Sequence, residues 1–300
     1  MTVSDSVTGV AASIVRPPGS AGVNRQGNHV NYGYVIPTGY PLEIADLAAE
    51  AEAAGWDGAF YWDGIDVSPA RPVFDPWVVM TAMAIRTSRV RLGAIISPLS
   101  RRRPWKVARE TISLDHVSAG RLVLPVGLGA VNSFGAVGEE ADRRTRAELL
   151  DESLDILQGL WSGEPFSYTG RHYQLGEMTF VPPPVQRPRV PIWPIGAWPY
   201  ERSMRRAVRY DGVIIEPQGE ELSPDLVRKV AEWVAEHRAS DGPFDLIVSG
   251  TTQGDDPDAA GPVDALADAG ATWWLEEKWE EPNDVDVVRA RIRQGPPRQR

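Results

Sequence analysis

Hydrophobic and polar positions follow two periods that alternate along the chain. Short apolar runs typical of buried strands are each followed by a stretch with apolar residues at helical spacing. The expected strands are residues 32–37, 57–62, 90–97, 121–129, 191–196, 211–216, 244–250 and 271–277. The expected helices are residues 41–55, 75–87, 104–120, 142–161, 199–210, 223–238, 257–269 and 285–293. Strands that alternate with helices predict an α/β fold with a parallel sheet.

Eight strand–helix pairs favour closure of this sheet into a (β/α)8 TIM barrel over an open sheet. The barrel is expected to form a single domain over residues 32–294. A disordered leader is expected over residues 1–31, and a frayed tail over residues 295–300. Residues 162–191 are rich in proline and glycine, and they are too long for an ordinary connection. We therefore expect an insertion between the fourth helix and the fifth strand.

Composition excludes several classes of function. The formal net charge is −10, so an acidic surface would repel phosphate backbones, and nucleic acid is not an expected partner. The chain has no cysteine, which excludes thiolate catalysis, disulfides and cysteine zinc sites. No apolar run approaches the length of a membrane span, and the first residues lack the apolar stretch of a signal peptide. A cytoplasmic protein with no membrane association is expected, and a homo-oligomer is an open possibility.

In such a barrel, function is expected where strands end and the following loops begin. A metal site needs several converging ligands, and of the four histidines only His172, in the insertion, is expected near these ends. No lysine lies on an expected strand, which argues against Schiff-base chemistry. Glu216 and Glu276 are candidates for a pair of glycosidase carboxylates, but the fourth and seventh strands end without acids. We expect no metal.

The remaining strand ends carry glycines, aromatic residues and apolar residues. Such a mouth suits a flat, conjugated cofactor that carries its own chemistry. Trp62 and Trp198 are expected to wall this pocket, with Trp273 and Trp274 as further candidates. Ordinary packing is the alternative for each tryptophan. The glycines at 127 and 129 lack a third glycine at the right spacing and follow the fourth strand, so they are a poor dinucleotide-binding fingerprint.

Several motifs, in order, resemble the luciferase-like flavin-dependent oxidoreductases. The third strand is followed by a helix that begins at Pro104, then by the turn LDHVSAGR at 114–121 and a strand that ends in GLG. The stretches LLDESLDILQGLWSGEPFSYTGRHYQL, FVPPPVQRPRVPIWPIGAW and RRAVRYDGVI resemble later parts of the family. The resemblance covers residues 33 to about 280 and implies a (β/α)8 barrel with an insertion that binds FMN or the deazaflavin F420.

The resemblance also implies where the cofactor lies. An irregular peptide at the end of the third strand, formed by Ala94, Ile95 and Ile96, is expected to support the ring. The cofactor phosphate is expected near the residues Gly127, Gly129, Asn132, Gly196 and Ala197. The amide groups at the start of the fifth helix give this anchor a physical basis. On this view a side chain at position 196 would push the backbone away from the phosphate.

Two departures from the family concern the catalytic groups. Many members carry Asp-His after the second strand, where this chain has Asp63-Gly64. The sugar-phosphate dehydrogenases of the family carry a glutamate after the glycines of the fourth strand, where this chain has Ala130. Dehydrogenation of sugar phosphates is therefore not expected. Asp63 is the candidate catalytic residue because pocket carboxylates are often tuned for proton transfer. The alternative is that Asp63 hydrogen-bonds the following loop.

The expected function is that of a monooxygenase that uses reduced FMN and oxygen on a small organic substrate. No second nucleotide-binding domain is recognisable, so a separate flavin reductase is the expected partner. The alternative within the same fold is hydride transfer with F420. A second alternative is a non-catalytic barrel that binds a flavin or another ligand without turnover.

Overall fold

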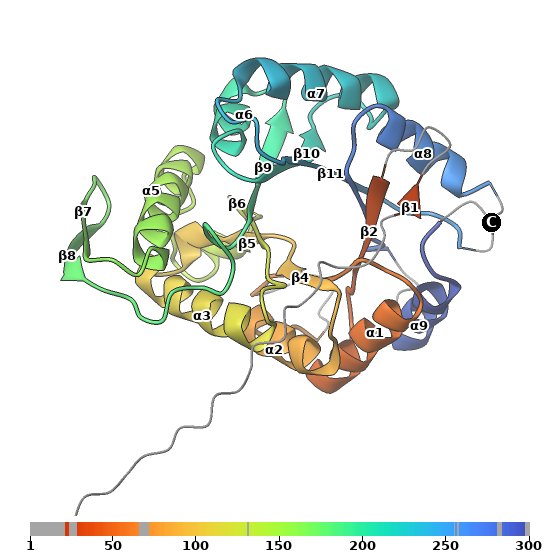
Figure 1. Ribbon diagram of the computed structural model, residues 1–300, viewed down its shortest axis with the longest axis horizontal. Coiled ribbons are helices and arrows are strands. Elements are labelled where there is room, and N and C mark those ends of the chain that lie inside the picture. Colours follow the sequence, from red (N-terminus) through yellow and green to blue (C-terminus); the bar gives the residue numbers. More distant parts are fainter. Residues whose placement is uncertain are drawn as a thin grey trace, which may run out of the picture.

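The parallel barrel predicted from the sequence is present in the structure, a computed structural model (Figure 1). The structure describes residues 22–23, 29–65, 72–130, 132–254, 256, 258–280 and 284–297. The barrel strands are β2 (His29–Val35), β3 (Gly58–Tyr61), β4 (Arg91–Ala94) with β5 (Ser97–Pro98), β6 (Leu124–Gly127), β9 (Ile192–Trp198), β10 (Gly212–Pro217), β11 (Asp245–Gly250) and β12 (Trp273–Glu276). The predicted fold class is therefore confirmed.

The ring closes through the third barrel strand, which is interrupted. Its first half, β4, pairs with β3, and its second half, β5, pairs with β6 through Ser97–Val126. A parallel bridge between Leu92 and Leu122 joins β4 to the chain just before β6. Two isoleucines, Ile95 and Ile96, separate the halves, and the peptide bond between them is cis. The irregularity expected at this strand end is thus found there.

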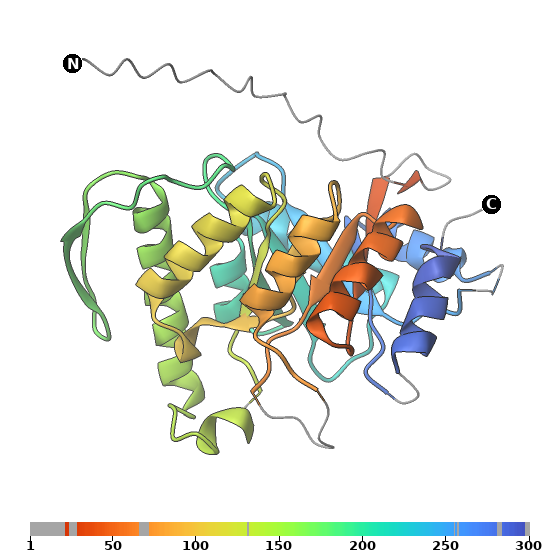
Figure 2. The same cartoon turned by 90° about the horizontal axis from the view of Figure 1, so that it is seen from below.

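Helices surround the barrel (Figures 1 and 2). They are α1 (Pro41–Ala53), α2 (Pro76–Arg86), α3 (Pro104–Val117), α5 (Arg143–Trp161), α6 (Glu201–Ala207), α7 (Pro224–His237), α8 (Ala260–Asp268) and α9 (Val285–Gln294). Proline occupies the first turn of α1, α2, α3 and α7, where its missing N–H is harmless. A 3₁₀ turn, η1 (Leu99–Arg101), and a short helix, α4 (Asn132–Gly135), were not predicted. No helix in the described ranges is long and apolar enough to cross a membrane.

The barrel interior is filled by aromatic and aliphatic side chains. Phe60, Trp193 and Trp273 pack against one another, with ring centroids 5.3–6.1 Å apart. Trp273 therefore belongs to the interior core and not to a pocket wall. The other face of each strand packs against the helices in a larger cluster, to which Trp274 belongs. The described side chains thus fill the interior of the barrel below the carboxyl ends of its strands. A ligand site is therefore expected at the strand ends.

The insertion lies between α5 and β9, as predicted, and contains a hairpin. Its strands are β7 (Phe166–Thr169) and β8 (Gln174–Met178), which pair antiparallel beside α5 (Figure 1). The Glu152 carboxylate on α5 accepts hydrogen bonds from the backbone N–H groups of Arg171, His172 and Tyr173. The His172 ring lies 3.0 Å from Glu148. The insertion is thus tied to the outer face of α5, away from the residues that line the barrel mouth.

The predicted limits of the domain need correction at both ends. The first barrel strand begins at His29, and β1 (Gly22–Val23) pairs with it antiparallel inside the predicted leader. The rest of the leader, residues 1–21 and 24–28, lies outside the described residues. At the other end, Gly295 and Pro297 are buried. The Tyr32 hydroxyl donates to the Pro297 carbonyl at 3.4 Å, so residues 295–297 pack on the barrel and are not frayed.

The LDHVSAGR turn is a structural junction between α3 and β6. The fully buried Asp115 carboxylate accepts hydrogen bonds from the backbone N–H groups of Val185 and Gln186 in the insertion. Gly120 has a φ of 80°, which favours glycine. The Arg121 guanidinium donates to the carbonyl groups of residues 84, 87 and 90 at the end of α2. These contacts fix chain crossings, which explains the motif without a catalytic role.

Candidate functional site

The carboxyl ends of the barrel strands open onto a cavity of about 590 Å³, which we call the mouth cavity. Strand ends, α5, α6 and the loop after β12 contribute its walls. It is lined by Ile95, Ile96, Gly127, Leu128, Gly129, Ala130, Arg143, Arg146, Leu150, Ile195, Ala197, Ser203, Arg206, Ile214, Glu216, Gln218, Ser249, Glu277 and Trp279. Five residues predicted to contact a cofactor are thus brought together here: Ile95, Ile96, Gly127, Gly129 and Ala197.

One wall of the mouth cavity is apolar and built by close packing. A Cβ atom on Gly127 would overlap the Ile96 side chain and lie 3.0 Å from Ile195. Gly129 has a φ of 73°, and a Cβ there would lie 2.9 Å from both Phe134 and Pro98. Both glycines are therefore required by the protein's own packing. A flat ring placed in the cavity would lie against the two isoleucines.

A second wall carries three arginines from α5 and α6. Arg146 is fully buried, and its Nη1 donates to the carbonyl groups of Leu128 and Gly129 at 2.7 and 3.1 Å. The Arg146 Nε has no partner among the described residues. Arg206 is held by the Asp151 carboxylate. This wall therefore presents positive charge that the protein neutralises only in part.

Arg143 is the most accessible of the three arginines. Its side chain is exposed, and it forms no ion pair with a described residue. Its neighbour Arg144, in contrast, is paired with Glu148 at 3.1 Å. An unpaired guanidinium at the edge of a cavity is suited to bind a carboxylate or phosphate.

Acidic groups and a hydroxyl face the cavity at the ends of β10, β11 and β12, where Glu216, Ser249 and Glu277 line it. The Ser249 hydroxyl donates to Glu277 Oε1 at 2.7 Å, and the Trp279 indole N–H donates to Oε2 at 3.2 Å. Glu216 has no hydrogen bond or ion pair to a described residue. Glu216 is exposed at the cavity, but partial desolvation there, and then the negative charge of Glu277, raise the pKa of its carboxyl group above the ordinary value.

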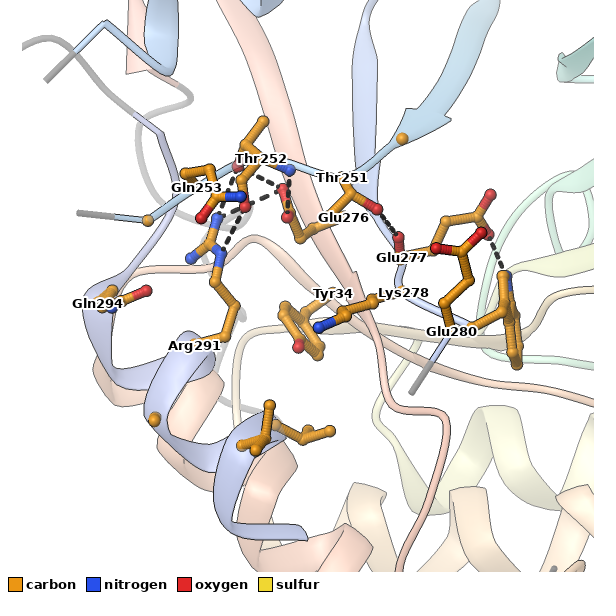
Figure 3. Close-up of a pocket in the computed structure, with 16 residues that line it drawn as sticks. Tyr34, Thr251, Thr252, Gln253, Glu276, Glu277, Lys278, Glu280, Arg291 and Gln294 are labelled. Atoms are coloured by element: carbon orange, nitrogen blue, oxygen red, sulfur yellow. Dashed lines mark hydrogen bonds and ion pairs between the residues drawn. The ribbon is translucent and has the colours of Figure 1, made fainter. Parts of the chain in front are cut away.

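A second cavity, of about 730 Å³, lies beside the first, between the loops after β11 and β12 and the helix α9 (Figure 3). The two cavities share Glu277 and Trp279. In the second cavity the buried Glu276 carboxylate accepts hydrogen bonds from the N–H and the hydroxyl of Thr252, both at 2.7 Å. Arg291 lies 3.3 Å from the same carboxylate. The acidic and basic groups at its back are thus satisfied by each other.

Tyr34 also faces this second cavity (Figure 3). Burial raises the pKa of its hydroxyl to about 12, with Arg291 acting against the rise and Glu276 adding to it. The phenol is therefore neutral at physiological pH. Beside its paired acid–base back wall, this cavity is also lined by the polar side chains of Gln253, Lys278, Glu280 and Gln294.

Asp63, the candidate catalytic residue, does not line the mouth cavity. Its carboxylate accepts two hydrogen bonds from Arg102, at 3.1 Å from Nε and 2.9 Å from Nη2. Burial raises the pKa of Asp63, and Arg102 opposes that rise. The neighbouring Trp62 donates to the Pro37 carbonyl and packs edge-on against Trp279. Asp63 therefore has a structural partner, and Trp62 supports the cavity wall from behind.

Other predicted cofactor contacts point away from the mouth cavity. Ala94 is buried in the cluster between strands and helices. A Cβ on Gly196 would overlap Val213 and lie 2.6 Å from the Met204 sulfur, so this glycine faces α6. Trp198 packs on the outer cluster. Asn132 begins α4, and its side chain lies outside the described residues.

The arginines and Glu277 were missed by sequence reasoning, although one signal was present. Arg146 occupies a helical position in line with Leu150, Ser153 and Leu157, all buried on α5. An arginine on the apolar stripe of a helix indicates a buried cation with a specific task. Glu277 was placed at the last strand end, but its pairing with Ser249 depends on the register between β11 and β12.

Comparisons with known proteins agree with this architecture. The chain is 33% identical over 165 residues to an F420-dependent glucose-6-phosphate dehydrogenase from Nakamurella multipartita. The aligned stretch covers 52% of this chain and 47% of that protein. It is 32% identical over 162 residues to a protein of the same name from Kineococcus radiotolerans, over 51% and 46% of the two chains. The chain thus spans about half the length of these curated relatives.

Solved structures match over a larger share of the chain. A coenzyme F420-dependent tetrahydromethanopterin reductase from Methanopyrus kandleri has a TM-score of 0.72 at 16% identity, covering 89% of this chain and 98% of that one. A monooxygenase from Streptomyces bottropensis has a TM-score of 0.73 at 19% identity, covering 88% and 97%. At these identities the likeness concerns the fold alone. The sequence profile of the luciferase-like monooxygenases matches residues 22–290, so the chain belongs to the luciferase-like monooxygenase family of oxidoreductases.

Proposed function

We propose that the protein is an F420-dependent oxidoreductase that transfers a hydride between the deazaflavin and a small organic substrate in the mouth cavity. The observation that carries this proposal is the division of that cavity into an apolar wall and a wall of incompletely neutralised arginines. F420 combines a flat ring with a phosphodiester and a carboxylate tail. The names of the curated relatives support F420 over FMN, the cofactor first expected from the sequence.

The residues of the cavity fit such a cofactor. Ile95 and Ile96 would support the ring, and Gly127 and Gly129 leave the backbone close to it. Arg143 would bind the anionic part, and the unpartnered Nε of the buried Arg146 offers a further donor. The Ala197 N–H donates to the Ser203 hydroxyl at 3.0 Å, so an anchor for the phosphate at this strand end would need other donors. When bound, the deazaflavin supplies the hydride, while the protein orients both reactants and excludes water.

We do not extend the substrate of the named relatives to this chain. The position after Asp63 is Gly64, and Ala130 follows Gly129. At the first of these places many members of the family carry Asp-His, and at the second its sugar-phosphate dehydrogenases carry a glutamate. Asp63 is moreover engaged by Arg102 outside the mouth cavity. A substrate other than a sugar phosphate therefore accords better with the groups that are present.

The proposal is tested by titrating the purified protein with F420, reduced F420, FMN and reduced FMN. Binding of F420 and oxidation of reduced F420 by a panel of ketones, aldehydes and enones are the expected results. Tight binding of reduced FMN with oxygen-dependent turnover, and no F420 binding, would instead support the alternative function, a monooxygenase that depends on a separate flavin reductase. Binding without turnover on any compound would support the non-catalytic barrel.

A further inference from the structure

The ends of three neighbouring strands aim polar side chains at the same place. Ile214 on β10, Ile247 on β11 and Leu275 on β12 all belong to the interior core of the barrel. Side chains alternate along a strand, so the residues two positions further on, Glu216, Ser249 and Glu277, also face the interior. All three line the mouth cavity. Two carboxyl groups and a hydroxyl therefore lie in one layer directly above the apolar core.

The two carboxyl groups have different partners. Glu277 accepts hydrogen bonds on both oxygens, from Ser249 at 2.7 Å and from Trp279 at 3.2 Å. Both partners are neutral donors, and they fix the orientation of the Glu277 carboxyl group. Glu216 has no partner among the described residues. Its carboxyl group is thus the one that is available to a ligand.

Four other charged side chains among the described residues line the cavity around Glu216. They are Arg143 and Arg146 on α5, Arg206 on α6 and Glu277 after β12. Arg206 is neutralised by Asp151, and Nη1 of Arg146 is bound to two carbonyl groups. Burial and the charge of Glu277 are the causes that act on Glu216, and both raise its pKa.

We propose that Glu216 is a catalytic acid–base residue that exchanges a proton with a substrate oxygen, and that Glu277, held by Ser249 and Trp279 in the same layer, is a positioning residue that acts on Glu216 through its charge. The proposal rests on the proposed function and deepens it, because it names the substrate class. A hydride acceptor that needs a proton on oxygen is a ketone or aldehyde, and the reverse substrate is an alcohol.

The reaction balances without a further reactant. In the direction of reduction, the carbonyl carbon would accept a hydride from reduced F420, so that a C–H bond of the cofactor breaks as one forms on the substrate, and the electron pair of the C=O π bond would move to oxygen. That oxygen takes the proton of Glu216, which gives the alcohol and leaves a carboxylate. Solvent restores the proton to Glu216 and receives the one lost from a ring nitrogen of the oxidised cofactor. Carbonyl is reduced, and deazaflavin is oxidised, by two electrons.

The first experiment needs neither cofactor nor substrate. The protein is labelled with carbon-13 at the glutamate carboxyls and titrated by NMR, and Glu216→Gln identifies the Glu216 signal. We expect its midpoint above the ordinary value for a glutamate and shifted downward in Glu277→Gln. Glu220→Gln, which removes an exposed carboxyl after the same strand, is the matched control and should shift nothing. An ordinary midpoint that does not respond to Glu277→Gln would overturn the proposal.

The second experiment measures reduction of a ketone panel by reduced F420. Glu216→Gln should bind F420 with wild-type affinity but lose turnover by at least a hundredfold, a typical loss for a general acid. Glu216→Asp should recover part of it, and Glu277→Gln should move the alkaline limb of the pH profile to lower pH. Turnover of Glu216→Gln within a few-fold of wild type would refute the catalytic role. Failure of the wild type to bind F420 would instead refute the proposed function. The NMR titration would still test the interaction between Glu216 and Glu277 separately.

Discussion

Asp63 and Arg102 form an ion pair in which a single carboxylate oxygen accepts two guanidinium hydrogen bonds. The Asp63 side chain is only 2% exposed, whereas that of Arg102 is 18% exposed. A nearly buried carboxylate whose Oδ2 is held by one arginine has little freedom to act on a ligand. The pair instead connects the end of β3 to the loop after β5.

We predict that Asp63→Asn destabilises the protein and leaves its chemistry largely intact. The loss should be about 2 kcal/mol in the free energy of unfolding, below the range for a fully buried pair because Arg102 reaches water. Turnover of the folded variant should stay within about threefold. Urea unfolding and cofactor-dependent turnover measure the two effects. Asp46→Asn, which breaks an exposed pair with Arg86, is the control and should cost well under 1 kcal/mol. A large loss of turnover at intact stability would instead support a catalytic role for Asp63.

Gly196→Val should act on stability and not on cofactor affinity. The new side chain would collide with Val213 and with the Met204 sulfur on α6, and overpacking of this kind costs about 1–3 kcal/mol. Gly176→Val is the control, because a Cβ at that strand position meets nothing within 4 Å. Thermal unfolding followed by titration of the folded variants with F420 separates the effects. A tenfold loss of affinity at intact stability would instead place the phosphate anchor at Gly196.

Arg143→Ala should weaken F420 binding by about tenfold at low salt, equivalent to about 1.4 kcal/mol. The effect should shrink as ionic strength rises, because an exposed cation is screened. Arg144→Ala, which removes a neighbouring arginine already paired with Glu148, should change affinity little. Fluorescence titration of F420 at two salt concentrations tests this. Equal effects of the two substitutions would argue against a specific contact at Arg143.

Stability should decline at alkaline pH partly through two tyrosines. Burial raises the pKa of Tyr34 and of Tyr210 to about 12, while an unfolded chain ionises tyrosine near its ordinary value of about 10. Their contribution is complete below about pH 10 and is lost as the pH rises to about 12, at up to about 3 kcal/mol each. Tyr34→Phe and Tyr210→Phe should flatten the decline seen in thermal unfolding across this range. Tyr200→Phe, at an exposed position, should not.

The order and type of the barrel elements were predictable because each strand and helix carries its own period of apolar residues. Which face of a strand points into the barrel was not predictable. The run PIWPIGAW in β9 is apolar on both faces, as expected for a strand covered on both sides. Its interior face, which carries Trp193 and Ala197, is set by packing in the closed barrel. The same ambiguity explains why Gly196 and Ala94 were assigned to the cofactor although they face the helices.

The polar part of the site was harder to foresee for a different reason. Arg143, Arg146 and Arg206 reach the mouth cavity from α5 and α6, whereas functional residues of a barrel are expected mainly at strand ends and in the loops that follow them. How a helix is rotated against the barrel decides which of its residues reach the cavity. Glu216 was considered from the sequence only as half of a pair with Glu276. The structure turns Glu276 outward and gives Glu216 a different neighbour, Glu277.

The pairing of the first barrel strand with the last one has a consequence for how the chain folds. Trp56, just before β3, donates its indole N–H to the Ile292 carbonyl, 236 residues further along the chain. The strand β2 likewise gains its second neighbour only when β12 is made. During synthesis one edge of the growing sheet stays open almost to the end, and contacts of such long separation form slowly. Truncation before β12 should therefore leave an unclosed barrel with exposed strand edges that promote aggregation, and the rate-limiting event in folding should be closure between β2 and β12.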